Sequence, residues 1–402
     1  MKAFFVPIIT LLVVLSFAAC SAEHNDPWDE IPNRHISALA IGNGTMFIVL
    51  PDGSLHVWGT NVGFPRVSTQ ATDLFGITVG EDMSVAYISA SGAGNFSGTF
   101  GQAMAITTDN ALYGWGYSRR GEVGSGTHAW QPHPVRIMDG VSTVSTGNLV
   151  TMAITTDGVL YGWGDNIWGV LGTLDVQYSA VPIRLMDGIT SVAVTRTHAL
   201  AITGDGSLYG WGMSSALGIG VRFPAESDAE DVRLSDYVMP APVRIMDGVT
   251  AVAVGGGFSL AICADGDLWS WGVNTNGQLG TGIFDNAPYP VRIKSNVADI
   301  SVGGAGTHVA ALTTDGGLYT WGRNNMGQLG NGTLDNQPTP MRIMDDVTHI
   351  FAGGFQSHAN TAAVRSDGSV WAWGDNWFRQ ISNDAAMPYY KVPVPLYELT
   401  SP

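Results

Sequence analysis

The sequence predicts an all-β fold, a seven-bladed β-propeller with four antiparallel strands per blade, on the basis of three regularities. A Trp-Gly pair recurs seven times, an Asp stands six positions before each Trp, and a Pro-Val-Arg-like segment closes most repeats. The Trp residues are Trp58, Trp115, Trp163, Trp211, Trp271, Trp321 and Trp373. Repetition at intervals of roughly 50 residues is typical of propellers and solenoids, because each unit buries its apolar faces only against its neighbours.

The composition is that of a packed, turn-rich chain. Of the 402 residues, 45% are hydrophobic and 13% are charged, with 52 glycines, which argues against disorder and against a long-helix protein. The formal net charge of −16 disfavours nucleic acid as a partner. Two cysteines cannot form a disulfide framework, so the stability must come from packing.

The N-terminal segment has the pattern of an export signal. Met1 and Lys2 precede an apolar run that ends in Ala18-Ala19-Cys20. It resembles a bacterial lipoprotein leader, which implies a signal peptide at residues 1–19, lipidation of Cys20 and a tether over residues 20–35. A membrane-spanning anchor is disfavoured because roughly 15 apolar residues are too few to cross a bilayer. We therefore expect a lipid-anchored protein of the bacterial cell envelope, exposed outside the cytoplasm.

Each repeat is expected to contain four strands, named A to D in chain order. Strand A is an apolar run such as residues 249–254, typical of a strand buried on both faces. Strands B and C, such as residues 258–262 and 267–271, flank an Asp-Gly turn and form a hairpin; Asn110 replaces Gly in one copy. Strand D contains Pro and Arg, as in residues 242–248, which suits an exposed edge.

Residues 36–400 are expected to form a single domain. Counted from strand A, its units are 36–73, 74–140, 141–188, 189–248, 249–296, 297–346 and 347–400. A closed ring is favoured over an open solenoid, because solenoid ends need polar caps and the first and last A strands, at 36–41 and 347–351, are apolar. The recurring Trp would then pack between neighbouring blades.

Residues 265–280 and 315–330 carry the full pattern Asp-Gly-x-Leu-x-x-Trp-Gly-x-Asn-x-x-Gly-Gln-Leu-Gly. This pattern resembles the repeat of the regulator of chromosome condensation family. The resemblance covers the chain from Ile36 onward, although Gly-Gln-Leu-Gly changes to Gly-Glu-Val-Gly at 121–124 and is missing from the first unit. It implies a seven-bladed propeller. The family's founding activity is nucleotide exchange on a nuclear small GTPase, which an exported, acidic chain is not expected to perform.

Antiparallel A-B-C-D order places the A–B and C–D loops on one side of the ring, here called the loop face, and the B–C and D–A connections on the other, the turn face. The expected insertions, residues 81–101 and 219–239, both fall on the loop face, which makes it the candidate binding face. Its C–D loops contain arginine and aromatic residues of the kind that protein interfaces favour. The candidate binding residues are Arg119, Arg120, Trp168, Arg323, Trp377 and Phe378, with Phe284 as a further aromatic. Trp168 and Trp377 are equally compatible with a structural role in covering the blade ends.

Catalytic and metal-binding patterns are scarce. The sequence contains no His-Glu-x-x-His, Gly-x-Ser-x-Gly, P-loop or paired-cysteine zinc motif, so neither a metal nor another cofactor is expected. His198, His308 and His358 recur at similar places, but a structural role is favoured over a ring of metal ligands. A solvated charge run is favoured over a calcium site for the acidic segment 226–236.

The sequence therefore favours a non-enzymatic binding or adhesion scaffold that recognises a protein or a glycan through the loop face. Two alternatives remain open. One is a propeller-type β-lactamase-inhibitory protein, and the other is a glycan-active hydrolase or lyase whose site forms between blades.

Overall fold

The computed structural model describes residues 38–41, 45–49, 53–59, 84–93, 100–221, 237–303, 306–354, 358–377, 381–382 and 386–396. The predicted leader, Cys20 and tether lie outside these residues, as does the acidic segment 226–236. The described part consists of strands and one short 3-10 helix, η1 (Ser214–Ala216). Within it, no helix is long and apolar enough to cross a membrane.

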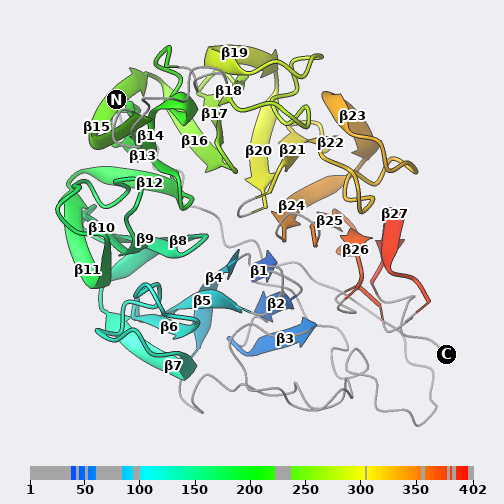
Figure 1. Ribbon diagram of the computed structural model, residues 1–402. Coiled ribbons are helices and arrows are strands. Elements are labelled where there is room, and N and C mark those ends of the chain that lie inside the picture. Colours follow the sequence, from blue (N-terminus) through cyan, green and yellow to red (C-terminus); the bar gives the residue numbers. More distant parts are fainter. Residues whose placement is uncertain are drawn as a thin grey trace, which may run out of the picture.

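The strands form seven antiparallel sheets arranged around a central axis (Figure 1). The first sheet contains β1 (Ala38–Ile41), β2 (Thr45–Val49) and β3 (Leu55–Gly59). The second contains β4 (Val85–Ala93), β5 (Phe100–Thr107), β6 (Leu112–Gly116) and β7 (Gln131–Met138). The third contains β8 (Val141–Gly147), β9 (Val150–Thr155), β10 (Leu160–Asp165) and β11 (Tyr178–Met186).

The remaining four sheets repeat this order. The fourth contains β12 (Ile189–Val194), β13 (His198–Thr203), β14 (Leu208–Met213) and β15 (Val238–Met246). The fifth contains β16 (Val249–Val254), β17 (Phe258–Cys263), β18 (Leu268–Gly272) and β19 (Ala287–Lys294). The sixth contains β20 (Val297–Val302), β21 (His308–Thr313), β22 (Leu318–Gly322) and β23 (Gln337–Met344), and the seventh contains β24 (Val347–Gly353), β25 (Asn360–Arg365), β26 (Val370–Asp375) and β27 (Tyr389–Pro395).

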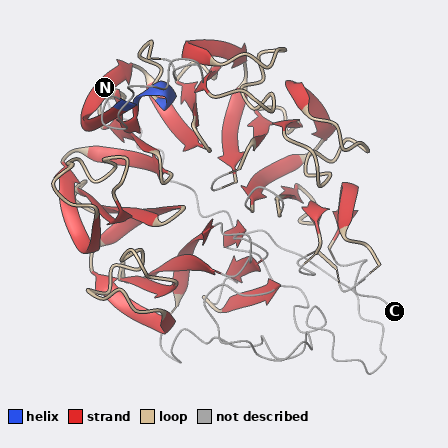
Figure 2. Cartoon of the chain, in the orientation of Figure 1, coloured by secondary structure: helices blue, strands red, loops and turns tan. Residues whose placement is uncertain are grey.

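Each sheet pairs its strands in chain order, and strand A lies nearest the axis (Figures 1 and 2). The propeller fold and its four-stranded antiparallel blades are therefore confirmed for six sheets. The first sheet has three strands among the described residues, and the part of unit 36–73 in which its fourth strand was predicted lies outside them.

The ring is closed by the packing of the first sheet against both of its neighbours. Leu39 and Met46 belong to the same core cluster as Trp373 of β26. On the other side of the sheet, the Phe47 ring lies edge-on to Trp115, with 6.4 Å between the ring centroids. Strand β1 accordingly contacts both β4 and β24. These contacts confirm a closed ring and exclude the open solenoid.

The predicted insertion at residues 81–101 is wrong. Strand β4 lies within it and pairs with β5 in a register that begins at Val85 opposite Thr107. This register buries Val85 and Ile88 in the core, so strand A of the second sheet starts later than the apolar run after residue 74 suggested. The other predicted insertion, at 219–239, does separate β14 from β15.

The recurring tryptophan joins adjacent blades. Its side chain is fully buried in six copies, Trp115, Trp163, Trp211, Trp271, Trp321 and Trp373. Five of these indoles donate Nε1–H to a carbonyl in the C–D loop of the preceding blade; Trp321, for example, donates to Gln278 O at 2.9 Å. The glycine that follows is needed because the backbone there has positive φ, +105° at Gly272, where a Cβ would lie 2.5 Å from Gly257 O.

Candidate binding face

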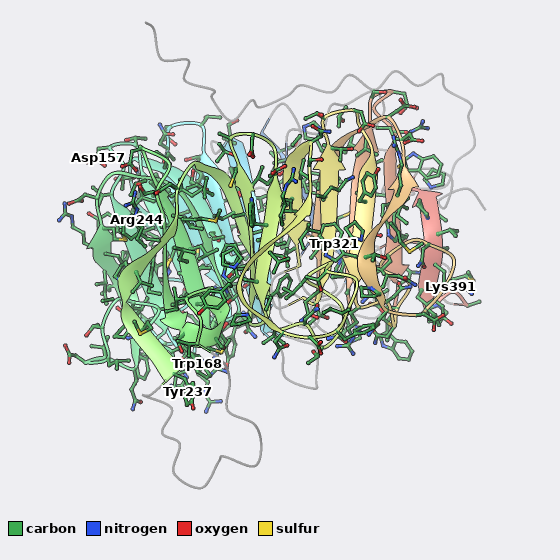
Figure 3. The ribbon with its side chains drawn as sticks, turned by 90° about the horizontal axis from the view of Figure 1, so that it is seen from above. Asp157, Trp168, Tyr237, Arg244, Trp321 and Lys391 are labelled. Carbon is green, nitrogen blue, oxygen red and sulfur yellow. The ribbon has the colours of Figure 1, made fainter. Side chains whose placement is uncertain are left out.

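The two faces of the ring are built differently. Seen from the side, Asp157 of a B–C turn lies at one face, and Trp168 and Tyr237 of C–D connections lie at the other (Figure 3). This is the arrangement that the strand order predicts.

The polar groups of the turn face are satisfied locally. In the B–C turns a strand-B hydroxyl donates to the turn carboxylate, as Thr203 does to Asp205 at 2.6 Å, and this hydrogen bond lowers the pKa of Asp205. Hydrogen bonds from Thr or Ser hydroxyls likewise lower the pKa of Asp109, Asp315 and Asp367. Strand-D arginines form exposed pairs with the D–A turns, as Arg184 does with Asp187 at 2.6 Å. Such pairs contribute at most about 1 kcal/mol each, and they leave few charges unmatched.

In four blades, the third, fifth, sixth and seventh, the C–D loop is organised around one asparagine. In the fifth sheet, Asn274 Oδ1 accepts the Leu279 N–H at 2.9 Å, while its Nδ2 donates to Ile283 O and Asp285 O. The same pattern recurs at Asn166, Asn324 and Asn376. The asparagine amide pairs with backbone N–H and C=O groups of its loop that have no partner strand. Loops of differing sequence are therefore held in the same way at their base.

A hydrogen-bond relay beneath the loops links adjacent blades in three pairs, the second with the third, the fourth with the fifth and the sixth with the seventh. His308 Nε2 lies 3.1 Å from the Thr361 hydroxyl, which donates to Gln328 O at 2.7 Å. His198 contacts Ser259, which donates to Ala216 O, in the same way. In the second sheet the first position is taken by Gln102, which donates to Thr151, and Thr151 donates to Glu122 O.

This relay explains the recurring histidines. His198 and His308 are fully buried, and burial lowers their pKa values to about 3 and about 4, so both rings are neutral bridging groups. His358 lies apart from the relay, with Nδ1 3.3 Å from Asp375 Oδ2. Across the described ranges, no three or more His, Cys, Asp and Glu residues come together as a metal site. The structural interpretation of His198 and His308 therefore accounts for their recurrence.

The structure distributes the predicted binding residues around the loop face. Arg119 is exposed, and the half-buried Arg120 guanidinium lies 5.6 Å from the centre of the Tyr178 ring. Arg323 is half-buried and donates to Asn325 at 3.0 Å. Trp377 is 69% exposed. Phe378 lies outside the described residues, as does the segment 222–236 within the second predicted insertion.

Trp168 packs against the protein core. It is partly buried and packs on the core cluster of the third and fourth sheets, which contains Trp211. The prediction that Trp168 or Trp377 covers a blade end therefore fits Trp168, whereas the exposure of Trp377 leaves it accessible.

Sequence reasoning missed most of the exposed apolar side chains. Fifteen large hydrophobic residues are exposed in the described part of the chain, and only Tyr87 lies outside a C–D loop or strand D. The others are Trp130, Ile167, Leu174, Val176, Tyr178, Val181, Ile283, Phe284, Tyr289, Val291, Leu334, Trp377, Met387 and Val392. Tyr178 also contacts His128 edge-on, at 5.0 Å between ring centroids, and so joins the second and third blades. Tyr289, which precedes the Pro-Val-Arg segment where other copies have no Tyr, Trp or Phe, gave an available signal, whereas Val291 belongs to that recurring segment and gave none.

Comparison with known proteins agrees with the repeat pattern. The family "Regulator of chromosome condensation (RCC1) repeat" matches residues 157–202, 265–312 and 315–359, and a second description of this repeat matches 189–216, 249–278 and 297–328. The chain is 33% identical over 78 residues to the Homo sapiens protein "Regulator of chromosome condensation", covering 18% of each chain. It is 35% identical over 101 residues to the Arabidopsis thaliana protein "RCC1 domain-containing protein RUG3, mitochondrial", covering 24% of this chain and 21% of that one. The alignments thus span about a fifth of the length of these relatives.

Solved structures share the fold over most of the chain. The structure of human WBSCR16 has a TM-score of 0.62 at 21% identity and covers 79% of this chain and 84% of its own. That of Prp20p from Saccharomyces cerevisiae has a TM-score of 0.65 at 19% identity and covers 81% of both chains. The chain therefore contains repeats that match the regulator of chromosome condensation repeat within residues 157–216 and 249–359, and the solved structures share its propeller fold.

Proposed function

We propose that this protein is a non-enzymatic binding scaffold that recognises a protein partner through its loop face. The observation that carries the proposal is the confinement of exposed large hydrophobic side chains, Tyr87 excepted, to C–D loops and outer strands among the described residues. Exposed apolar and aromatic groups held on a rigid base are what protein interfaces use. The locally paired turn face offers few such groups.

The known partners of similar proteins support a protein ligand over a glycan. The Prp20p structure is described together with its binding to Gsp1p and histones, and yeast RCC1 (Prp20) has been solved with Kap60. These partners belong to that protein. For the present chain, the net charge of −16 disfavours nucleic acid as the ligand.

We also propose that the first sheet is a seventh blade and that residues 36–400 form a single domain.

We further propose that this domain is displayed on the bacterial envelope. The leader pattern supports cleavage after residue 19, lipidation of Cys20 and a tether over 20–35. Strand β1 begins on the turn face, so the chain enters the ring on the side away from the loop face. A Cys20→Ala variant should move from the membrane to the soluble fraction and lose labelled palmitate. An unchanged distribution and label would contradict the anchor.

The binding proposal is tested with residues 21–402 immobilised and exposed to extracellular and envelope protein extracts. An Arg119→Ala, Trp377→Ala variant should lose the partners retained by the wild type, because both side chains are exposed on the loop face. Arg184→Ala, an exposed turn-face arginine, is the control and should retain them. Both variants should keep the wild-type unfolding midpoint, since exposed substitutions usually change stability by about 0.5 kcal/mol or less. Equal loss or equal retention in the two variants would refute the loop face as the binding surface, and retention of glycans alone would refute a protein partner.

A further inference from the structure

The C–D loop of the second blade differs in charge from the loops of the other blades. Counted from the Trp-Gly pair, Arg119 and Arg120 occupy two adjacent positions that are uncharged in the other six copies. The fifth and sixth blades have an exposed aspartate 14 residues after the Trp, where the second has Ala129. Relative to those two blades, this loop has two additional positive charges and one negative charge fewer.

Within the described residues, the Arg119 and Arg120 guanidinium groups form no ion pair with a carboxylate. Seven other arginines of this part of the chain do pair with aspartates: Arg136, Arg184, Arg196, Arg244, Arg292, Arg342 and Arg365. Glu122 is buried, and its Oε2 accepts the Arg120 backbone N–H at 2.7 Å. The exposed Asp175 of the adjoining C–D loop accepts from the Thr173 hydroxyl at 2.9 Å. The charges of Arg119 and Arg120 are therefore available to a ligand.

The Arg120 guanidinium is held against an aromatic ring of the third blade. Its Cζ lies 5.6 Å from the centre of the Tyr178 ring, and the His128 ring meets the same tyrosine edge-on at 5.0 Å. The Gly126 N–H fixes the loop on β11 by donating to Ala180 O at 2.8 Å. A guanidinium that rests on a ring can still donate its N–H groups to a carboxylate. It is also ordered before the ligand arrives, which lowers the entropic cost of binding.

Exposed apolar side chains lie at the same junction of blades. Tyr178 and Val181 are exposed near the start of β11, and Trp130 is exposed two residues after His128. Together with the two arginines, these residues form a surface here called the arginine patch, which consists of Arg119, Arg120, His128, Trp130, Tyr178 and Val181. Guanidinium groups beside exposed aromatic rings suit a ligand that carries carboxylates next to an apolar side chain.

We propose that the arginine patch binds an acidic segment of a protein partner, in which Asp or Glu side chains stand next to an aromatic one. The carboxylates of the partner accept hydrogen bonds from the Arg119 and Arg120 guanidinium groups, and its aromatic side chain packs on the exposed rings of the patch. This description of the partner rests on the proposed function, because it takes the loop face as the binding surface.

The net charge of the chain makes the predicted preference specific to the patch. A surface of net charge −16 attracts basic peptides as a whole, so an acidic ligand is the opposite of what bulk electrostatics selects. At physiological salt such fields are screened beyond about 8 Å, and contacts within the patch then decide what binds. A long polyanion extends past the patch and meets the surrounding negative charge, whereas a short acidic segment does not. The patch therefore fits a protein segment better than a nucleic acid or an anionic polysaccharide.

The first test uses a library of random dodecapeptides displayed on phage and selected on the immobilised protein. Selected sequences should be enriched, relative to the unselected library, in Asp and Glu next to Trp, Tyr or Phe. Enrichment of basic or uncharged sequences alone, or of no sequence, would overturn the proposal. Binding of heparin without enrichment of any peptide would identify a polyanion as the ligand and would likewise overturn it.

The second test measures the Kd of the most enriched peptide by fluorescence anisotropy. Replacing both arginines, as Arg119→Gln and Arg120→Gln, should raise the Kd by about 10-fold or more through loss of charge-assisted hydrogen bonds. Ala129→Asp leaves both arginines in place and should raise the Kd by about 5-fold or more, because it adds a repelling carboxylate. The control, Arg184→Gln with Lys391→Gln, removes two exposed positive charges outside the patch and should leave the Kd within about 2-fold of the wild-type value.

The outcomes separate this proposal from the proposed function. A wild-type Kd in the variant that lacks Arg119 and Arg120, or an equal rise in the control, would overturn the arginine patch. If that variant binds the peptide normally while Trp377→Ala abolishes binding, the loop face remains the binding surface and only the patch is refuted. If the control alone weakens binding, both the patch and the loop face are refuted.

Discussion

Replacing His198 and His308 by glutamine should remove most of the loss of stability that this propeller undergoes in mild acid. Both rings are fully buried in the relay between blades, and their pKa values are lowered from 6.5 to about 3 and about 4. The folded state therefore requires neutral rings while the unfolded state takes up protons below pH 6.5. The stabilisation is present above that pH and is lost as the pH falls toward the folded pKa values.

The magnitude follows from the two pKa values. Between about pH 7.5 and about pH 5, each histidine should lower the free energy of unfolding by about 2 kcal/mol. The two together should lower it by about 4 kcal/mol. Glutamine is a suitable replacement because Gln102 occupies the equivalent position in β5 and donates to Thr151 at 3.0 Å. The variant should therefore keep the bond to the neighbouring hydroxyl without taking up a proton.

The assay is equilibrium urea unfolding at the two pH values, with the difference in free energy compared between proteins. Contributions from the other titratable groups cancel in this comparison. His133→Gln, an exposed replacement on β7, is the control and should behave like the wild type. If the double variant loses as much stability in acid as the wild type, within about 1 kcal/mol, the buried neutral histidines do not contribute the acid sensitivity inferred for them.

Three further predictions concern the framework. Trp321→Phe should lower the free energy of unfolding by about 1–3 kcal/mol through loss of the bond to Gln278 O, measured by urea unfolding; a change below about 0.3 kcal/mol would contradict this role. Asn324→Ala should increase amide hydrogen exchange in the β22–β23 loop, because the Asn324 bonds to that loop are lost. Unchanged protection of these amides would show that the loop is ordered without the Asn324 side chain. Gly116→Ala should reduce the yield of folded protein and its melting temperature, since a Cβ would lie 2.4 Å from Gly101 O, whereas a wild-type melting curve would refute the backbone constraint.

Regular features of the sequence were sufficient to predict most of the fold. The Asp-to-Trp spacing and the apolar A strands predicted antiparallel four-stranded blades, which six sheets confirm. They also predicted the burial of the tryptophans and the separation of the two faces. These inferences succeed because strand periodicity and turn chemistry are local properties of the chain.

The errors arise where neighbouring segments compete for the same role. Two apolar stretches precede β5, and only pairing with β5 selects Val85–Ala93 as strand A. Trp168 packs on a core cluster and Trp377 is 69% exposed; Trp377 aligns in the repeat with the exposed Ile167, one position before Trp168, so counting from the preceding Trp-Gly pair would have separated the two. The choice of strand A, by contrast, depends on pairing with another strand, which no local pattern contains.

The sequence alone determined the kind of unit, its repetition and the residues that make its turns, because each follows from spacing and backbone preference. Only the tertiary structure decided how the units meet. It revealed the relay through His198 and His308 and the asparagine-centred loops. These features join residues that are distant in the chain or in different blades, and the burial that gives them their chemistry exists only once the ring has closed.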